Sequence, residues 1–135
     1  HDREEAFSLS DKIAVMNHGK IVQYDTPENL YFEPKNRFAA EFSGASNFIL
    51  QDGKTFLVRP DWFSLASRTL DSAESKKLIS GKIISSSFLG SRVEYKIQTE
   101  QTENQILTAD LASINPKIET GANVTLEILR QIEIG

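Results

Sequence analysis

The stretch Arg92-Val93-Glu94-Tyr95-Lys96-Ile97-Gln98 alternates strictly between side chains suited to a core and side chains suited to solvent. A period of two residues is that of a β-strand with one buried face, so this stretch predicts such a strand. The same alternation returns near the end of the chain at Val124, Leu126 and Ile128, and Ile132 and Ile134 lie at the same even spacing from them. The second half of the chain is therefore expected to be built from half-buried strands.

Four further β-prone runs lie in the same half, at residues 48–50, 55–58, 82–84 and 105–107. Turn-forming residues separate them: Asp52-Gly53, Gly90-Ser91 and Gly121. About six short strands in so few residues predict a small antiparallel barrel or sandwich, because closure protects the edges of a short β domain. The polar stretch 66–77 is expected to be a mobile loop or a solvated helix without chemistry.

The first part of the chain shows a mixed pattern. We expect a helix over about residues 3–9, capped by Asp2, and then a hairpin of strands 13–16 and 21–24 around an Asn-His-Gly-Lys turn. Thr26-Pro27-Glu28 predicts the start of a helix that ends before Pro34, and a last helix is expected over about 36–42, with Gly44 as its stop. The period then changes to that of strands, so we place a domain boundary near Ser46, between domains 1–46 and 47–135.

Composition excludes several classes of function. The 15 basic and 19 acidic residues give a net charge of −4, and no basic cluster is large enough to follow a nucleic acid backbone. There is no cysteine, so disulfides and thiolate metal sites are excluded, and no apolar run is long enough to span a bilayer or to suggest a signal peptide. The chain opens at His1 without an initiator methionine, so we expect it to be a piece of a longer protein.

Few residues suggest chemistry of their own. His1 and His18 are the only histidines and lack a metal-ligand spacing, so no metal site is predicted. No phosphate-binding loop and no nucleophile elbow occurs. The acids of the first helix are interpreted as partners of its dipole rather than proton donors, and Trp62 as a packed side chain rather than a stacking platform.

One long segment resembles a known family. The run HDREEAFSLSDKIAVMNHGKIVQ, residues 1–23, closely resembles the end of the nucleotide-binding domain of ABC transporter ATPases, beginning with the switch histidine. DTPENLY at 25–31, Pro34 and FAAEFSG at 38–44 resemble the importers of sugars, polyamines, ferric iron, sulfate and similar solutes. The remainder, with VRPD at 58–61 and SFLG at 87–90, is similar to the family's appended TOBE domain.

The resemblance implies a mainly β fold: an OB-like β-barrel, the TOBE domain, preceded by a small α/β remnant of the nucleotide-binding domain. It implies that His1 contacts the γ-phosphate of ATP and helps to place the attacking water in the intact subunit. The other catalytic motifs would lie upstream of His1. We therefore expect no cofactor in this chain, ATP and Mg²⁺ in the intact subunit, and no ATPase activity of the chain alone. Asp25 stands where the family commonly has glycine, so that turn is expected to differ.

The resemblance also implies partners and a place in the cell. We expect a homodimer with a second copy of the subunit, contact with the membrane permease subunits, and a cytoplasmic, peripheral position on the inner face of the membrane. The barrel is expected either to regulate the importer or only to support its dimer. The transported solute is not readable from the residues, and the context of the VRPD and SFLG motifs favours ferric iron or a polyamine.

A second hypothesis comes from a different class. The barrel is interpreted as an autonomous binding module for a small oxyanion or a metal complex, with Ser85, Ser86 and Ser87 and the backbone N–H groups near Gly90 and Gly121 as donors. Three adjacent serines also suit a solvent-facing strand. In either case, we expect an apolar set from the first domain to pack in a dimer, consisting of Phe7, Leu30, Phe38 and Phe42.

Overall fold

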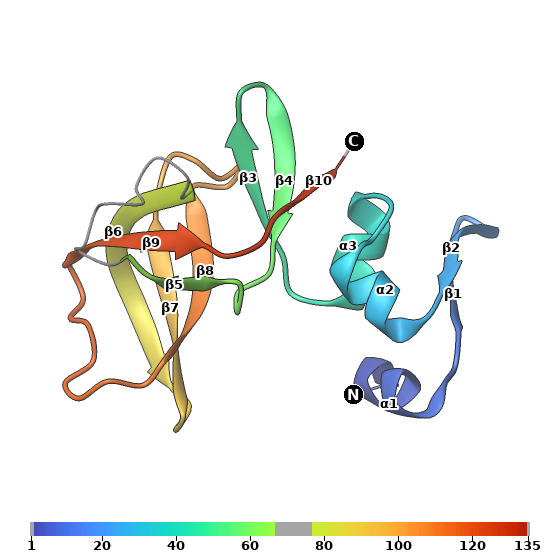
Figure 1. Cartoon of the computed structure of the whole chain (residues 1–135), viewed down its shortest axis with the longest axis horizontal. Helices are drawn as coiled ribbons and strands as arrows, with labels where there is room; N and C mark the ends of the chain where they lie inside the picture. The colour runs from blue at the N-terminus through green and yellow to red at the C-terminus, as the bar shows by residue number, and fades with distance from the viewer. Residues whose placement is uncertain (1, 67–76, 135) are drawn as a thin grey trace. The chain divides into compact units, whose positions relative to one another are not determined.

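The chain is described by a computed structural model over residues 2–66 and 77–134 (Figure 1). It divides into two compact units, residues 1–46 with 134–135 and residues 47–133. The fold is mainly β, with small α/β elements in unit 1 and a curled antiparallel half-barrel in unit 2, which confirms the predicted fold class. Among the described residues, no helix has the length and apolar character needed to cross a bilayer.

Unit 1 contains every element expected from its sequence. These are α1 (Asp2–Leu9), β1 (Ile13–Asn17), β2 (Lys20–Asp25), α2 (Pro27–Phe32) and α3 (Arg37–Ser43). His18 and Gly19 form a two-residue turn in which both φ angles are positive, at 52° and 77°, while Asn17 and Lys20 pair across it. Thr26 caps α2 by accepting from Asn29 N at 3.2 Å, and Asn36 caps α3 by accepting from Ala39 N at 2.9 Å.

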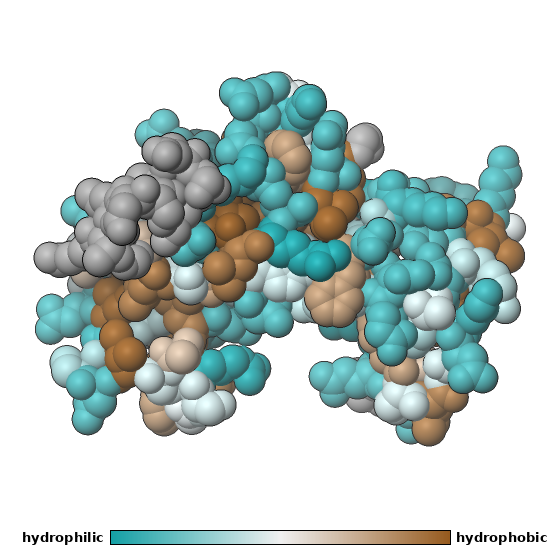
Figure 2. Space-filling model, viewed as in Figure 1, coloured by the Kyte–Doolittle hydropathy of each residue, from teal (hydrophilic) through white to brown (hydrophobic). Residues whose placement is uncertain are grey.

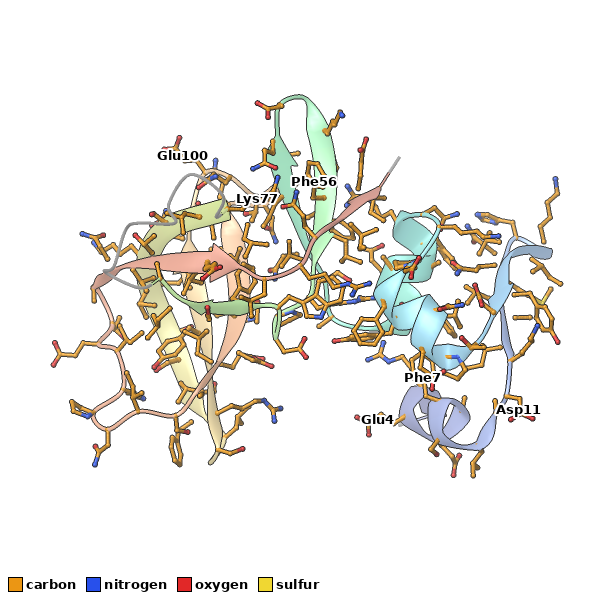
Figure 3. The ribbon with its side chains drawn as sticks, in the orientation of Figure 1. Glu4, Phe7, Asp11, Phe56, Lys77 and Glu100 are labelled. Carbon is orange, nitrogen blue, oxygen red and sulfur yellow. The ribbon has the colours of Figure 1, made fainter. Side chains whose placement is uncertain are left out.

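The core of unit 1 is small. Val15, Leu30, Ala39 and Ala40 are fully buried, and Ser43 Oγ lies 2.8 Å from the Leu30 carbonyl oxygen, which ties α3 to α2. Figure 3 places Phe7 on the side of α1 that faces α2. Of the four residues expected to pack in a dimer, Leu30 is buried within the chain, whereas Phe38 and Phe42 remain 38% and 42% exposed.

Unit 2 consists of two sheets. A three-stranded sheet has the order β10-β4-β3, and a five-stranded sheet has the order β5-β9-β6-β7-β8. The bounds are β3 (Asn47–Gln51), β4 (Lys54–Val58), β5 (Phe63–Leu65), β6 (Lys77–Phe88), β7 (Arg92–Gln98), β8 (Ile106–Ala112), β9 (Asn123–Ile128) and β10 (Ile132–Ile134). The expectation of about six short strands was wrong, because β5 was missed and β6 runs over 12 residues. Of the polar stretch 66–77, residues 67–76 lie outside the described part of the chain.

Strand β6 changes partner along its length and so curls the sheet. Residues 77–82 pair with β9, and residues 82–88 pair with β7. Near this crossing, the Cβ of any residue at Gly81 would lie 2.5 Å from Ile97 Cγ2 and even closer to the Gln98 carbonyl oxygen. Only glycine therefore allows the two strands to approach as they do. A bulge at Ile84 then shifts the register, so that Ser86 rather than Ser85 lies opposite Tyr95.

Backbone groups on the outer edge of β8 form hydrogen bonds with one side chain and one carbonyl oxygen from other parts of unit 2. Asn47 donates from Nδ2 to the Thr108 carbonyl oxygen and accepts from Thr108 N through Oδ1, both at 2.8 Å. Two residues further, Asp110 N donates to the Pro60 carbonyl oxygen at 2.8 Å. We call these contacts the seam, and they occupy edge groups that would otherwise be open to another strand.

The inner face of the five-stranded sheet forms the main core. It is lined by buried residues of β6, β7, β8 and β9: Ile79, Ile83, Val93, Tyr95, Ile97, Leu107, Ala109, Leu111, Val124, Leu126 and Ile128. The Tyr95 hydroxyl oxygen accepts from Ile118 N at 3.1 Å, which fixes the loop between β8 and β9. Apolar side chains also reach the surface among hydrophilic ones (Figure 2).

Candidate functional site

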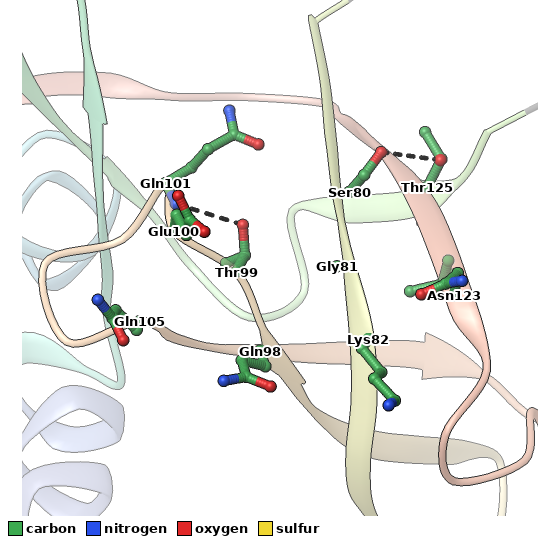
Figure 4. A pocket seen from close by; sticks show the side chains of 11 residues that line it. Ser80, Gly81, Lys82, Gln98, Thr99, Glu100, Gln101, Gln105, Asn123 and Thr125 are labelled. Atoms are coloured by element: carbon green, nitrogen blue, oxygen red, sulfur yellow. Dashed lines mark hydrogen bonds between the residues drawn. The ribbon is translucent and has the colours of Figure 1, made fainter.

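A polar hollow lies in unit 2, where β6 changes partner. It has a volume of about 750 Å³ and is formed by the first half of β6, the end of β7 with the turn after it, and the start of β9 (Figure 4). Gly81 is part of the lining, so the strand crossing that requires glycine lies at the hollow.

Most of the described residues that line this hollow have polar side chains. They are Ser80, Lys82, Gln98, Thr99, Glu100, Gln101, Gln105, Asn123 and Thr125, and Val124 is the one apolar side chain among these described residues. Ser80 and Thr125 share a hydrogen bond between their hydroxyl groups at 2.9 Å. In the described part of the chain, Lys82 and Glu100 form no ion pair, so the hollow offers one unused cation and one unused carboxylate.

A partly buried carboxylate, that of Asp110, lies at the seam near two other acidic side chains. Asp110 lies opposite Glu94 in the β7–β8 register, and its Oδ2 is 3.4 Å from Arg92 Nε. Its other oxygen, Oδ1, is buried and has no hydrogen-bond partner. Burial raises the pKa of the Asp110 carboxyl, Arg92 opposes that shift, and the charges of Glu94 and Asp61 add to it.

The donors expected for an oxyanion or a metal complex lie on β6, in the turn after it and in the loop before β9. Ser85, Ser86 and Ser87 follow one another along β6, and Gly90 lies in the turn after it, where its carbonyl oxygen accepts from Ser113 Oγ. The N–H group of Gly121 is already bound to the Ile83 carbonyl oxygen at 2.8 Å. No group of three or more acidic or histidine side chains among residues 2–66 and 77–134 is arranged to hold a metal ion. The binding role of these five residues stays a prediction.

The remaining residues singled out from the sequence have simpler surroundings. Trp62 is 6% exposed, and the Arg130 guanidinium lies 5.3 Å from its ring centre, so the ring is packed rather than presented for stacking. His18 is exposed in the hairpin turn. His1, the expected switch histidine, lies outside the described residues.

Hydrogen bonds to the Asp25 side chain fix the turn before α2. Its Oδ1 accepts from Asn29 Nδ2 and from Thr26 N, both at 2.9 Å. The hydrogen bond from Asn29, and then that from Thr26, hold the pKa of the Asp25 carboxyl below its usual value. Gln23 is buried beside it and accepts from Lys35 N at 2.8 Å, which ties the hairpin to the segment after α2.

Comparison with known proteins gives one consistent result, although no family model matches the chain. The spermidine/putrescine import ATP-binding protein PotA of Onion yellows phytoplasma is 34% identical over an alignment of 148 residues. The alignment covers 91% of this chain and 34% of that protein. The protein of the same name from Clostridium acetobutylicum is 35% identical over 127 residues, covering 76% of the chain and 34% of that protein. The Bacillus thuringiensis (strain Al Hakam) protein is 33% identical over 125 residues, covering 92% and 37%.

The chain is related to the carboxy-terminal part of ABC importer ATP-binding proteins. This confirms the resemblance drawn from the switch-histidine segment and the barrel motifs. The chain spans about a third of the length of these import ATP-binding relatives. The residues around the hollow were not found from the sequence. One signal was present, because a glycine inside a strand pattern, here Gly81, often marks a close backbone approach.

Proposed function

We propose that the chain is the carboxy-terminal part of the ATP-binding subunit of an ABC importer that takes up polyamines. The observation that carries the proposal is the similarity over about nine-tenths of the chain to proteins named for spermidine and putrescine import. The residues alone favoured ferric iron or a polyamine, and these names favour the polyamine.

Unit 1 is proposed to be the end of the nucleotide-binding domain. A two-stranded hairpin is marginally stable by itself, and the β1–β2 hairpin exposes Met16, Ile21 and Tyr24 by 56–60%. The relatives carry about two thirds of their length beyond the part matched here. That further sequence is the natural cover for the hairpin, and it would hold the ATP and Mg²⁺ sites to which His1 contributes as the switch histidine.

Unit 2 is proposed to pair two subunits and to regulate the importer. Phe88 and Leu89, before the β6–β7 turn, are 65% and 49% exposed, and Ile114, after β8, is 48% exposed. Ser113 N donates to the Ser91 carbonyl oxygen at 3.0 Å, which brings the two chain segments together. Exposed apolar groups that lie together favour a protein contact, here with a second copy of the chain. The assembled subunits would lie on the cytoplasmic face of the membrane, against the permease.

The ATPase assignment can be tested with a chimera in which this chain replaces the matching third of the Clostridium acetobutylicum protein. The chimera should hydrolyse ATP, whereas the 135-residue chain alone should not. His1→Asn should reduce the rate of hydrolysis by at least about tenfold, because the attacking water loses a group that positions it. His18→Asn is the matched control, since His18 is exposed in a turn. Equal loss in both variants, or no loss in either, would refute the switch role.

The pairing and transport roles need separate measurements. Sedimentation equilibrium of the chain should show a dimer that Phe88→Ser weakens and Leu129→Ser does not, because Leu129 is exposed to a similar degree, 58% against 65%, but lies after β9. A monomer at high concentration would contradict the pairing role. Deletion of the gene should abolish uptake of spermidine and putrescine and leave that of ferric iron unchanged, and the opposite result would reject the polyamine assignment.

A further inference from the structure

We propose that the hollow around Gly81 is a binding site for a small zwitterion, a molecule that carries both an ammonium and a carboxylate group. Neither the relatives nor the motifs of the sequence assign a ligand to this place. The proposal does not depend on the ATPase assignment, because all the residues that form the hollow belong to unit 2.

The chemistry of the lining limits the ligand. With nine hydrogen-bonding side chains against one apolar side chain, the hollow suits a molecule without a large apolar surface. The described residues of the lining contain no aromatic ring on which a sugar could stack. A small polar solute with several donors and acceptors therefore fits best.

The charges of the hollow narrow the class further. Among the described residues that line the hollow, the charged side chains are Lys82 on β6 and Glu100 in the turn after β7, and they are labelled apart from each other in Figure 4. A polycation would meet the ammonium group of Lys82, and an oxyanion would meet the carboxylate of Glu100. A zwitterion has a partner for each group: its carboxylate for Lys82 and its ammonium for Glu100.

The flanking side chains and the backbone are suited to the same ligand. Gln98, Gln105 and Asn123 carry carboxamides whose side chains make no hydrogen bond within the described residues, so each can donate and accept. The floor is held by the β6–β7 and β6–β9 ladders, which meet at Lys82. Because both charges are exposed to water, we expect a dissociation constant in the millimolar range.

The experiment is a titration of the ¹⁵N-labelled 135-residue chain followed by NMR chemical shifts. The probes are glycine, γ-aminobutyrate and 6-aminohexanoate, which separate the two charges by different lengths, together with spermidine and sulfate. We expect saturable shifts at the N–H groups of Gly81, Gln98 and Asn123 with at least one of the amino acids. The chain length of the amino acid that binds most tightly indicates the distance between the charges of Lys82 and Glu100.

Charge variants distinguish the classes of ligand. For a zwitterion, Lys82→Gln and Glu100→Gln should each weaken binding by about threefold to fivefold, as expected for exposed charge pairs. Lys117→Gln and Glu119→Gln are the matched controls, because both residues are exposed and lie outside the hollow, and they should leave binding unchanged. Thermal unfolding of each variant verifies that the fold is kept.

Three results would overturn the proposal. Binding of spermidine that Lys82→Gln strengthens would identify a polycation site. Binding of sulfate that Glu100→Gln strengthens would identify an anion site. The absence of saturable shifts with all three amino acids would show that the hollow is only a solvated surface.

Discussion

Replacement of Gly81 by alanine should destabilise unit 2, and the structure indicates by how much. The added methyl group would lie 2.5 Å from Ile97 Cγ2 and closer to the Gln98 carbonyl oxygen, so both must retreat by about 1 Å to reach ordinary contact distance. The carbonyl group cannot turn away freely, because Gln98 is paired with Lys82 in the β6–β7 ladder. Overpacking of this kind costs about 1–3 kcal/mol, and the smaller entropy of the unfolded alanine chain offsets about 0.4–1 kcal/mol of that cost.

We therefore expect Gly81→Ala to lower the free energy of unfolding by about 1–2 kcal/mol in urea denaturation monitored by Trp62 fluorescence. Gly53→Ala is the matched control. Its φ is +75° and no atom lies within 4 Å of the added Cβ, so it carries a backbone cost of about 1 kcal/mol without a clash. Crowding at Gly81 should also narrow the hollow and weaken any ligand bound there, whereas Gly53→Ala should not. A Gly81→Ala variant as stable as the wild type would refute the close approach of β6 and β7.

Three further predictions concern single hydrogen-bonded groups. Asn47→Ala should cost about 2–3 kcal/mol in urea denaturation, because the buried amide loses both bonds to Thr108 at the seam, and a loss below about 0.5 kcal/mol would show that the seam is not closed by this side chain. Asp110→Asn should stabilise the chain at pH 7 by about 0.5–1 kcal/mol, because the variant no longer buries a charged carboxylate. Since the folded pKa of Asp110 is raised, the carboxylate of the wild type is neutralised as the pH falls through that pKa, and the gain in stability should shrink. A gain that persists at pH 3 would contradict the burial of its charge. Asn29→Ala should move the depressed pKa of Asp25 up towards 3.8 in an NMR titration, because the hydrogen bond from Asn29 is the largest cause of the depression. The stability that Asp25 contributes is present above 3.8 and is lost as the pH falls through the folded pKa, so the variant should lose less stability over that range. An unchanged pKa would mean that Asn29 is not the main partner of Asp25.

The local elements of unit 1 were predictable because their signals lie within a few residues of one another. Thr26 and Asn36 cap helices by bonds to the residue three positions later, and the His18-Gly19 turn needs only two residues that accept positive φ. The signal for β7 was equally local. The strand buries one face, so apolar and polar residues alternate along its sequence.

The elements that the sequence concealed all depend on distant partners. The serines of β6 do not alternate with apolar residues, because the strand changes partner and bulges, so only pairing with both β7 and β9 reveals its full length. The three-residue strand β5 is too short to show a period and is defined by β9. The hollow likewise joins residues up to 45 positions apart, from Ser80 to Thr125.

Residue order alone was enough to establish the similarity to import ATP-binding proteins, the mainly β class and the local turns and caps, because these depend on short spans of sequence or on a long shared segment. Only the tertiary structure shows that the seam covers the edge of β8 and that a hollow lies beside β6. Asn47 reaches Thr108 across 61 positions, and Lys82 and Glu100 line one hollow, only because the strands between them pair in one register. Charge and hydrogen-bonding capacity are properties of single residues, but a site requires that folding bring them together.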